Sequence, residues 1–483
     1  MAILLLRDYQ LEMIDGGRAA LRRARRVLLQ APTGAGKTAL ASFMAGETAA
    51  KGRQIFFVCH RAELVEGTSR TFAKFGIQHS FIAAGLPMDL RARVLICSID
   101  TLKTRLHLVP RPYLVIWDEC HHLGAAGWAR VMEHYASAYH IGLSATPCRL
   151  DGAGLDAYFD TMVEGPSVAW LIEEGHLAPY RIFAPPPPGE LLQVKLRGDD
   201  ATGKQAGILD KPKLIGDVVT NWQKNAAGLR SVIFGATIAH SMHMAEQFNA
   251  AGIPAAHLDG NTPKGQRAGI IRDYAEGRLL VLTNRDLFGE GFDLAALAGR
   301  DVTVDCVAQV RRTNSLALHL QQQGRALRPA PGKVAIILDH AGNTQMHGFP
   351  DDEREWTLEG REKNTKNKDN GPPPPVTCDN CFMQIRRPLP DCCPSCGKRL
   401  LAKVREIEVA DGELRELTAS DKAAMRAQRK RELAEAKSLQ ELVALGVKHG
   451  YKSPMAWAQR QFAGRAHARK LYQTGQHPKI NHK

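Results

Sequence analysis

The residues best suited to chemistry lie in one run near the start of the chain, QAPTGAGKT at positions 30–38. An apolar run precedes it and a helix-compatible run follows, which predicts a strand, a glycine-rich loop and a helix. In this arrangement backbone N–H groups wrap a triphosphate, and the helix directs its positive end at the same anion. Lys37 is expected to reach the β- and γ-phosphates, and Thr38 to bind magnesium. The predicted nucleotide-binding residues of this loop are Pro32, Thr33, Gly34, Ala35, Gly36, Lys37 and Thr38.

Two adjacent acids, Asp118 and Glu119, end a second apolar run and are followed by two histidines. Carboxylates at the end of a buried strand are costly unless a cation or a reaction uses them. Asp118 is therefore expected to hold the magnesium ion, directly or through water, and Glu119 to polarise the attacking water. The histidines also suit a metal hydrolase, but the H-E-x-x-H spacing does not occur in the sequence.

A glutamine- and arginine-rich run, QQQGRALR, occupies positions 321–328. Arg325 and Arg328 lie three residues apart, so on a helix they would share one face. Two guanidinium groups directed at a γ-phosphate offset the charge that develops during its transfer. The pair therefore suits a catalytic role as arginine fingers; a basic amphipathic helix without a catalytic part is the alternative.

The ten cysteines divide into two groups. Five are scattered through apolar runs and are expected to be reduced and buried. The other five lie between Cys378 and Cys396 in two C-x-x-C pairs, a spacing that suits tetrahedral thiolate coordination. This predicts a structural zinc ribbon, with a redox C-x-x-C as the alternative. The predicted zinc ligands are Cys378, Cys381, Cys393 and Cys396, with Cys392 able to replace Cys393.

The composition is that of a globular protein with a basic balance, +14 over 483 residues. From Lys398 onward the sequence holds 19 Lys and Arg against 9 Asp and Glu, so +10 of that charge lies in the last 86 residues. Such a charge favours polyanionic partners, although a basic tail that only aids solubility would look the same. No apolar run approaches the length of a membrane helix and no signal peptide is recognised, so we expect a cytoplasmic protein with a reducing environment.

Apolar runs that alternate with helical patterns predict an α/β fold built on mainly parallel, doubly wound sheets. A proline run at 185–188 marks a break between two such sheets, and a charged, proline-rich stretch follows the second. No second phosphate loop occurs, so one triphosphate between two unequal lobes is expected. The predicted parts are a nucleotide-binding domain (1–178), a second domain (179–350), a linker (351–376), the zinc ribbon (377–400) and a basic helical tail (401–483).

Taken in order, these motifs resemble those of superfamily 2 DExH-box helicases. The resemblance rests on Gln10, the A-x-x-G-x-G-K-T loop that begins at Ala31, D-E-C-H from Asp118, and S-A-T at 144–146. It points to the branch that contains excision-repair and transcription-repair DNA helicases and many phage or bacterial helicases. It implies two RecA-like domains and covers residues 1–345. One departure is Gln322, where the family's last motif has its first arginine.

The resemblance also implies roles for residues outside these runs. Arg7 and Gln10 match the motif that reads adenine, and Gln321 belongs to the same catalytic motif as Arg325. Gly291 and Asp293 match a motif that contacts the nucleotide. The residues at positions that contact nucleic acid in the family are His60, Arg61, Ser98, Thr237 and Thr283.

We therefore expect an ATP-dependent helicase or translocase that uses ATP and Mg²⁺ and acts on single-stranded or forked DNA. An RNA helicase is the nearest alternative. A nucleic-acid sensor or remodeler that hydrolyses ATP without separating strands is another. The motor of a restriction system is a third, although no nuclease-like acidic cluster is evident in the sequence.

Overall fold

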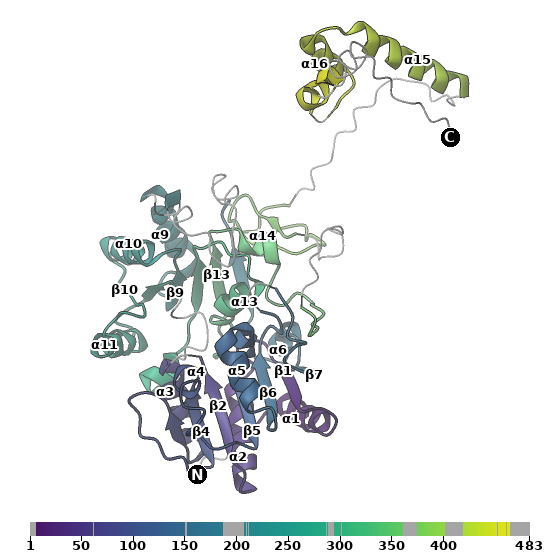
Figure 1. Cartoon of the computed structure of the whole chain (residues 1–483). Helices are drawn as coiled ribbons and strands as arrows, with labels where there is room; N and C mark the ends of the chain where they lie inside the picture. Colours follow the sequence, from purple (N-terminus) through teal and green to yellow (C-terminus); the bar gives the residue numbers. More distant parts are fainter. Residues whose placement is uncertain are drawn as a thin grey trace, which may run out of the picture. The chain divides into compact units, whose positions relative to one another are not determined.

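The first lobe is a seven-stranded parallel sheet with helices on its faces (Figure 1). The computed structural model describes residues 6–60, 62–149, 152–186, 207–208, 210, 212–285, 287, 294–300, 302–360, 374–400, 419–451, 453–459 and 461–463. The strands of the first lobe are β1 (Arg26–Gln30), β2 (Ile55–Cys59), β3 (Ser80–Ile82), β4 (Val94–Ser98), β5 (Leu114–Asp118), β6 (Tyr139–Ser144) and β7 (Thr161–Glu164). Its helices are α1 (Asp8–Leu21), α2 (Lys37–Ala50), α3 (Ala62–Lys74), α4 (Ile99–Leu102), the 3-10 turn η1 (Cys120–Gly124), α5 (Ala126–His134) and α6 (Val168–Glu173).

The strand order β3-β4-β2-β5-β6-β1-β7 brings the two chemical runs of the first lobe together. Strand β6 pairs in parallel with both β1 and β5, so the glycine-rich loop after β1 and the acids after β5 leave the sheet at the same edge. The middle positions of β1, β2 and β5 are apolar because helices cover both faces of the sheet. The wholly apolar cores of β1, β2 and β5 therefore place polar residues only where each strand ends.

The second lobe is a six-stranded parallel sheet of order β10-β11-β9-β12-β13-β8. Its strands are β8 (Tyr180–Phe183), β9 (Ser231–Phe234), β10 (Ala255–His257), β11 (Val281–Asn284), β12 (Cys306–Gln309) and β13 (Ala335–Asp339). Its helices are α9 (Pro212–Ala226), α10 (Ile238–Ala250), α11 (Lys264–Ala275), α12 (Leu294–Ala298), α13 (Leu316–Gly324) and α14 (Asn343–His347). The two parallel α/β sheets confirm the predicted fold class.

The two lobes touch through specific contacts at the end of α13. Ala178 N donates to Leu327 O at 2.8 Å, and Gln321 Nε2 lies 3.5 Å from Glu119 Oε2. Ala326 and Leu327 are buried in the same apolar cluster as residues of the first lobe. The turn that follows α13 is thus packed directly on the first lobe.

A small antiparallel pair, β14 (Val376–Thr377) and β15 (Gln384–Ile385), carries the clustered cysteines. We call residues 376–400 the cysteine knuckle. It extends the second lobe, because Ala184 N, just after β8, donates to Phe382 O at 2.9 Å. Cys378, Cys381 and Ile385 pack in one apolar cluster with residues of the second sheet.

Residues 403–483 form a separate compact unit. Helix α15 (Ala419–Glu435) is followed by α16 (Leu439–Lys448), which begins with a capping box between Ser438 and Glu441. A short helix at 454–459 completes a small core around Ala436, Leu442 and Ala458. Trp457 packs against this core, whereas Tyr451 and Phe462 are exposed. Among the described residues, no helix is both long and apolar enough to cross a membrane.

Candidate nucleotide site at the seam of two lobes

The glycine-rich loop between β1 and α2 has the backbone of a phosphate cradle. Gly34 and Gly36 adopt φ values of +91° and +84°, which only glycine adopts at little cost. Helix α2 begins at Lys37, so its unpaired N–H groups face the loop. The loop is tied to the neighbouring strand, because Ala31 N donates to Ser144 O at 2.9 Å. The backbone here therefore has the shape of an anion-binding turn.

Gln10 holds the glycine-rich loop from outside. Its Nε2 donates to Ala35 O at 3.0 Å, and its Oε1 accepts from Arg7 N at 3.0 Å. Tyr9 Oη donates to the same Ala35 carbonyl at 2.9 Å. Both functions of the Gln10 amide are therefore used within the protein in this conformation. The residue predicted to read adenine supports the loop here, and Arg7 caps α1 beside it.

Glu119 occupies an unusual backbone position directly after β5. Its φ of 49° and ψ of 55° lie in the left-handed region, a conformation that costs a non-glycine residue about 1–3 kcal/mol. Its side chain is buried, with Oε1 3.7 Å from Lys37 Nζ and Oε2 3.5 Å from His121 Nδ1. Burial, and then the Glu119 charge, raise the pKa of Asp118 well above its ordinary value. Two carboxylates so placed favour a cation between them.

Both predicted arginines face the acids across one cavity of about 650 Å³. Helix α13 ends at Gly324, so Arg325 and Arg328 lie on the turn after the helix and not on one helical face. The turn still directs both into the cavity, which unites the two lobes. The predicted residues that line this cavity are Thr33, Gly34, Gly36, Lys37, Thr38, Asp118, Glu119, Arg325 and Arg328.

The end of α13 approaches the glycine-rich loop more closely than a side chain would allow. A Cβ added at Gly324 would lie 2.6 Å from Thr33 Cβ. Gln322, which stands where the resembled family has an arginine, is turned into the second lobe and accepts from Gln309 Nε2 at 2.9 Å. The seam is thus made by Gln321, Gly324, Arg325 and Arg328, while Gln322 supports them from behind.

Of the five residues predicted to contact nucleic acid, two are half-buried, two are buried and one lies outside the described residues. His60 packs its ring 4.7 Å from the ring of His122, and Thr237 caps the start of α10 by accepting from His240 N. Ser98 is buried at the end of β4. Thr283 is fully buried and donates to Ser241 O at 2.7 Å, so it binds α10 to β11 and does not reach the surface. Arg61, Gly291 and Asp293 lie outside the described residues.

The seam is chemically suited to a triphosphate with a magnesium ion. Within the described part of the chain, Thr33 Oγ1, Thr146 Oγ1 and Gln321 Oε1 are buried without a hydrogen-bond partner. Buried polar atoms without partners mark places where a ligand or ion can bind. Thr38 and Asp118 offer the oxygen ligands that magnesium prefers. The donors present therefore fit both groups.

The four predicted zinc ligands converge in the cysteine knuckle. The Sγ atoms of Cys378 and Cys396 are 3.7 Å apart, and those of Cys381 and Cys393 are 3.6 Å apart. A tetrahedral zinc with bonds of about 2.3 Å sets sulfur–sulfur distances of about 3.8 Å. Cys392 is exposed and outside this cluster, whereas Cys393 lies within it. The five scattered cysteines are buried and form no disulfide, as predicted.

Several residues near the seam have no counterpart in the sequence reasoning. Thr303, Pro329 and Pro331 line the same cavity as the arginines. Asp352 and Arg354, in the stretch predicted to be a linker, line a second cavity behind Thr33. The only sequence signal in that stretch is Trp356, a large aromatic residue that an extended linker does not need.

Family models match both lobes. Residues 3–149 match the model described as the res subunit of type III restriction enzymes, and residues 210–330 match the helicase conserved C-terminal domain. A 51.5 kDa protein of a Lactococcus phage (isolate 7-9) is 34% identical over 329 residues, which cover 68% of each chain. The Saccharomyces cerevisiae protein named as the ATP-dependent helicase IRC3 is 28% identical over 67% of this chain and 49% of its own length.

The fold is also found among solved structures. A fragment from Vibrio vulnificus YJ016, described as the HsdR subunit of a type I restriction enzyme, superposes with a TM-score of 0.55 at 20% identity. The match covers 74% of this chain and 67% of the fragment. This chain spans about half the length of the yeast relative, and the matches to the two family models end before the cysteine knuckle.

Proposed function

The chain belongs to the superfamily 2 helicases, which hydrolyse ATP, and we propose which of its residues carry out ATP hydrolysis and which class of nucleic acid it moves along. The observation that carries the proposal is the single cavity lined by a phosphate loop and two acids from the first lobe and by two arginines from the second. A triphosphate bound there would touch both lobes at once.

Hydrolysis at this seam divides the work among a few side chains. Backbone N–H groups of residues 34–38 and the Lys37 ammonium hold the phosphates. Thr38 and Asp118 would hold magnesium, which neutralises charge on the phosphate oxygens. Glu119 accepts a proton from the attacking water. Arg325 and Arg328 stabilise the charge that grows on the transferred phosphoryl group.

The same geometry couples hydrolysis to movement. The arginines and Gln321 belong to the second lobe, so their approach to the nucleotide depends on how the lobes are docked. A ligand that binds the docked state better shifts the population towards it. Repeated docking and release while each lobe grips a strand would produce stepping along nucleic acid.

DNA, single-stranded or forked, is the proposed track. The chain carries +14, and the model that matches its first lobe is that of a restriction-enzyme subunit. In the helical unit, Arg429, Lys430 and Arg431 are exposed on α15 and can neutralise backbone phosphates. Replacing these three with glutamine should lower the salt dependence of DNA binding. An unchanged salt dependence would show that these residues of the helical unit do not contact the DNA backbone.

The deciding experiment measures ATP hydrolysis with single-stranded DNA, forked DNA, duplex DNA and RNA of matched sequence. We expect single-stranded or forked DNA to stimulate most, and Lys37→Ala or Glu119→Gln to abolish turnover. Stimulation of ATP hydrolysis by RNA alone would show that the substrate is RNA and not DNA. Substantial hydrolysis in either variant would contradict the roles proposed for these residues.

Translocation along duplex DNA without strand separation is the second candidate. It is supported by the match of the first lobe to a restriction-enzyme subunit model. A labelled-strand displacement assay separates the two candidates: strong stimulation by duplex DNA without displacement favours the translocase. For the cell we propose a reducing compartment, which is consistent with cysteines that form no disulfide among the described residues.

A further inference from the structure

A segment that no motif covers forms the back wall of the nucleotide seam. We call residues 348–356 the back segment. It follows α14 and, together with Thr33 of the glycine-rich loop and Leu320, Gly324 and Leu327 around the end of α13, lines a cavity of about 180 Å³. We call residues 325–328, the turn after α13, the arginine turn. A shift of the back segment would therefore change the packing beneath both the glycine-rich (phosphate) loop and the arginine turn.

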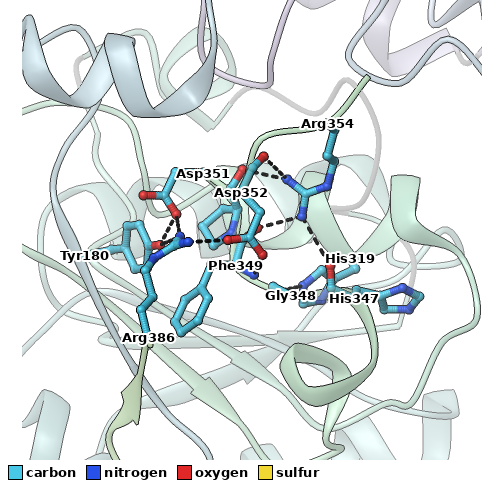
Figure 2. A network of polar contacts seen from close by, with 10 residues as sticks. Tyr180, His319, His347, Gly348, Phe349, Asp351, Asp352, Arg354 and Arg386 are labelled. Atoms are coloured by element: carbon cyan, nitrogen blue, oxygen red, sulfur yellow. Dashed lines mark hydrogen bonds and ion pairs between the residues drawn. The ribbon is translucent and has the colours of Figure 1, made fainter. Parts of the chain in front are cut away.

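The back segment is tied to α13 itself. His319, near the middle of α13, places its Nε2 3.3 Å from Gly348 O (Figure 2). Burial of His319 lowers its pKa well below the ordinary value, so the ring is neutral and its Nε2–H donates to this carbonyl. His319 thus fixes the start of the back segment to the helix that ends at the catalytic turn.

Arg354 holds the turn of the back segment in one shape. Its Nη2 donates to Phe349 O at 2.6 Å and to His347 O at 3.2 Å, and its Nη1 donates to Asp352 O at 2.9 Å. The Asp352 carboxylate accepts from Phe349 N at 2.7 Å. The segment is therefore a closed turn whose carboxylates are held in place.

Arg386 reaches this turn from the cysteine knuckle, one residue after β15. Its guanidinium pairs with the carboxylates of both Asp351 and Asp352 and lies 3.2 Å from the Tyr180 hydroxyl (Figure 2). It also stacks over the Phe349 ring, 4.2 Å from the centroid. The Asp352 side chain is only 6% exposed, so without this cation two adjacent acids would face each other in a poorly hydrated site.

We propose that Arg386 is a positioning residue of the ATPase, which lets the cysteine knuckle set the distance between the arginine turn and the phosphate loop. It clamps the back segment, the back segment holds α13 through His319, and α13 ends at the arginines. The knuckle itself is anchored on β8 through Phe382 and Ala184, so it acts as a fixed support. The inference rests on the proposed function of Arg325 and Arg328.

The test compares Arg386→Gln with Arg387→Gln in the full chain. Arg387 is the next residue, is exposed and makes no ion pair among the described residues, so it is a matched control. At saturating DNA we expect Arg386→Gln to lower kcat for ATP hydrolysis about tenfold, the scale of a small misplacement of catalytic groups, with KM for ATP unchanged. Arg387→Gln should match the parent chain in both constants.

Two further variants test the ion pair itself. Arg386→Lys should recover part of the lost kcat, because it restores the charge but not the two-pronged geometry. Asp352→Asn in the Arg386→Gln background should recover activity relative to Arg386→Gln alone, because it removes the more buried of the two carboxylates that Arg386→Gln leaves without their cation. Zinc content and the thermal unfolding midpoint, measured on every variant, show whether the knuckle has remained folded.

The inference is overturned if Arg386→Gln and Arg387→Gln have the same kcat. It is also overturned if Arg386→Gln loses zinc or unfolds at a much lower temperature, since the residue would then be structural only. The proposed function fails differently: the parent chain itself would show no ATP hydrolysis that depends on nucleic acid and on Lys37.

Discussion

Gly324 offers the sharpest test of the seam, because the close approach of the two lobes depends on its missing side chain. In Gly324→Ala the new methyl carbon would lie 2.6 Å from Thr33 Cβ and 2.7 Å from its Cγ2. Carbon atoms pack at about 3.5–4.0 Å, so the end of α13 must retreat by about 1 Å. The contact between the two lobes yields more easily than the backbone within either lobe, so we expect the arginine turn to move away from the phosphate loop.

A displacement of about 1 Å in a catalytic group costs up to about 10²-fold in rate, which corresponds to about 2.7 kcal/mol of barrier. We therefore expect kcat for ATP hydrolysis to fall by about 10- to 100-fold in Gly324→Ala. Binding of a fluorescent ATP analogue should persist, since the cradle at residues 34–38 belongs wholly to the first lobe. The assay is steady-state hydrolysis at saturating DNA, with nucleotide binding measured separately.

The matched control is Gly269→Ala, a glycine within α11 where an added methyl meets nothing within 4 Å. This change should leave kcat unchanged and stabilise the helix by about 0.5–1 kcal/mol. In a Thr33→Gly background the clash partner is gone, so the penalty of Gly324→Ala should shrink. If Gly324→Ala hydrolyses ATP as fast as Gly269→Ala, the close approach of the lobes plays no part in the cycle.

Three other outcomes follow from the structure. Arg328→Ala should keep ATP binding but slow hydrolysis by about 10³-fold, and an unchanged rate would move the catalytic arginine elsewhere. Metal analysis should find zinc in the purified chain, lost in Cys378→Ser but retained in Cys392→Ser; equal zinc in both variants would contradict the ligand set. Burial lowers the pKa of His140 to about 4, against about 6.5 unfolded, so the unfolded chain binds more protons between these values. The contribution of His140 to the free energy of unfolding is therefore largest above about pH 6.5, and it falls by about 1 kcal/mol between about pH 6.5 and about pH 5.5. Between these two pH values the loss of stability, measured by thermal unfolding, should be smaller in His140→Gln than in the parent chain. An equal loss would show that His140 does not cause the pH dependence.

The parts of the site that the sequence could predict are those that depend on local structure. A glycine-rich turn between an apolar strand and a helix has few other uses, so Lys37 and Thr38 could be placed before the fold was known. Asp118 and Glu119 could be placed because an apolar strand must end where its polar residues begin. The strand order then brings both to one edge, as parallel sheets of this kind require.

The parts that could not be predicted depend on contacts between distant segments. Thr283 stands at the end of a strand, as a surface residue would, but β11 lies between β10 and β9 and is covered on both faces, so the side chain is buried. The helical spacing of Arg325 and Arg328 misplaced them on one helix face, because α13 ends at Gly324 where it meets Thr33. Arg386 carries no motif, and only its partners Asp351 and Asp352 give it a role.

Glu119 shows how the two lobes can share control of one reaction. One of its oxygens faces Lys37 of its own lobe at 3.7 Å, and the other faces Gln321 of the second lobe at 3.5 Å. Separation of the lobes would remove a neutral amide donor, so it would change the direction of the carboxylate more than its charge. A general base must be aimed at its water within hydrogen-bond reach to act. In the proposed mechanism, docking of the second lobe would therefore orient the base as well as deliver the arginines, and an undocked enzyme would hold ATP without hydrolysing it.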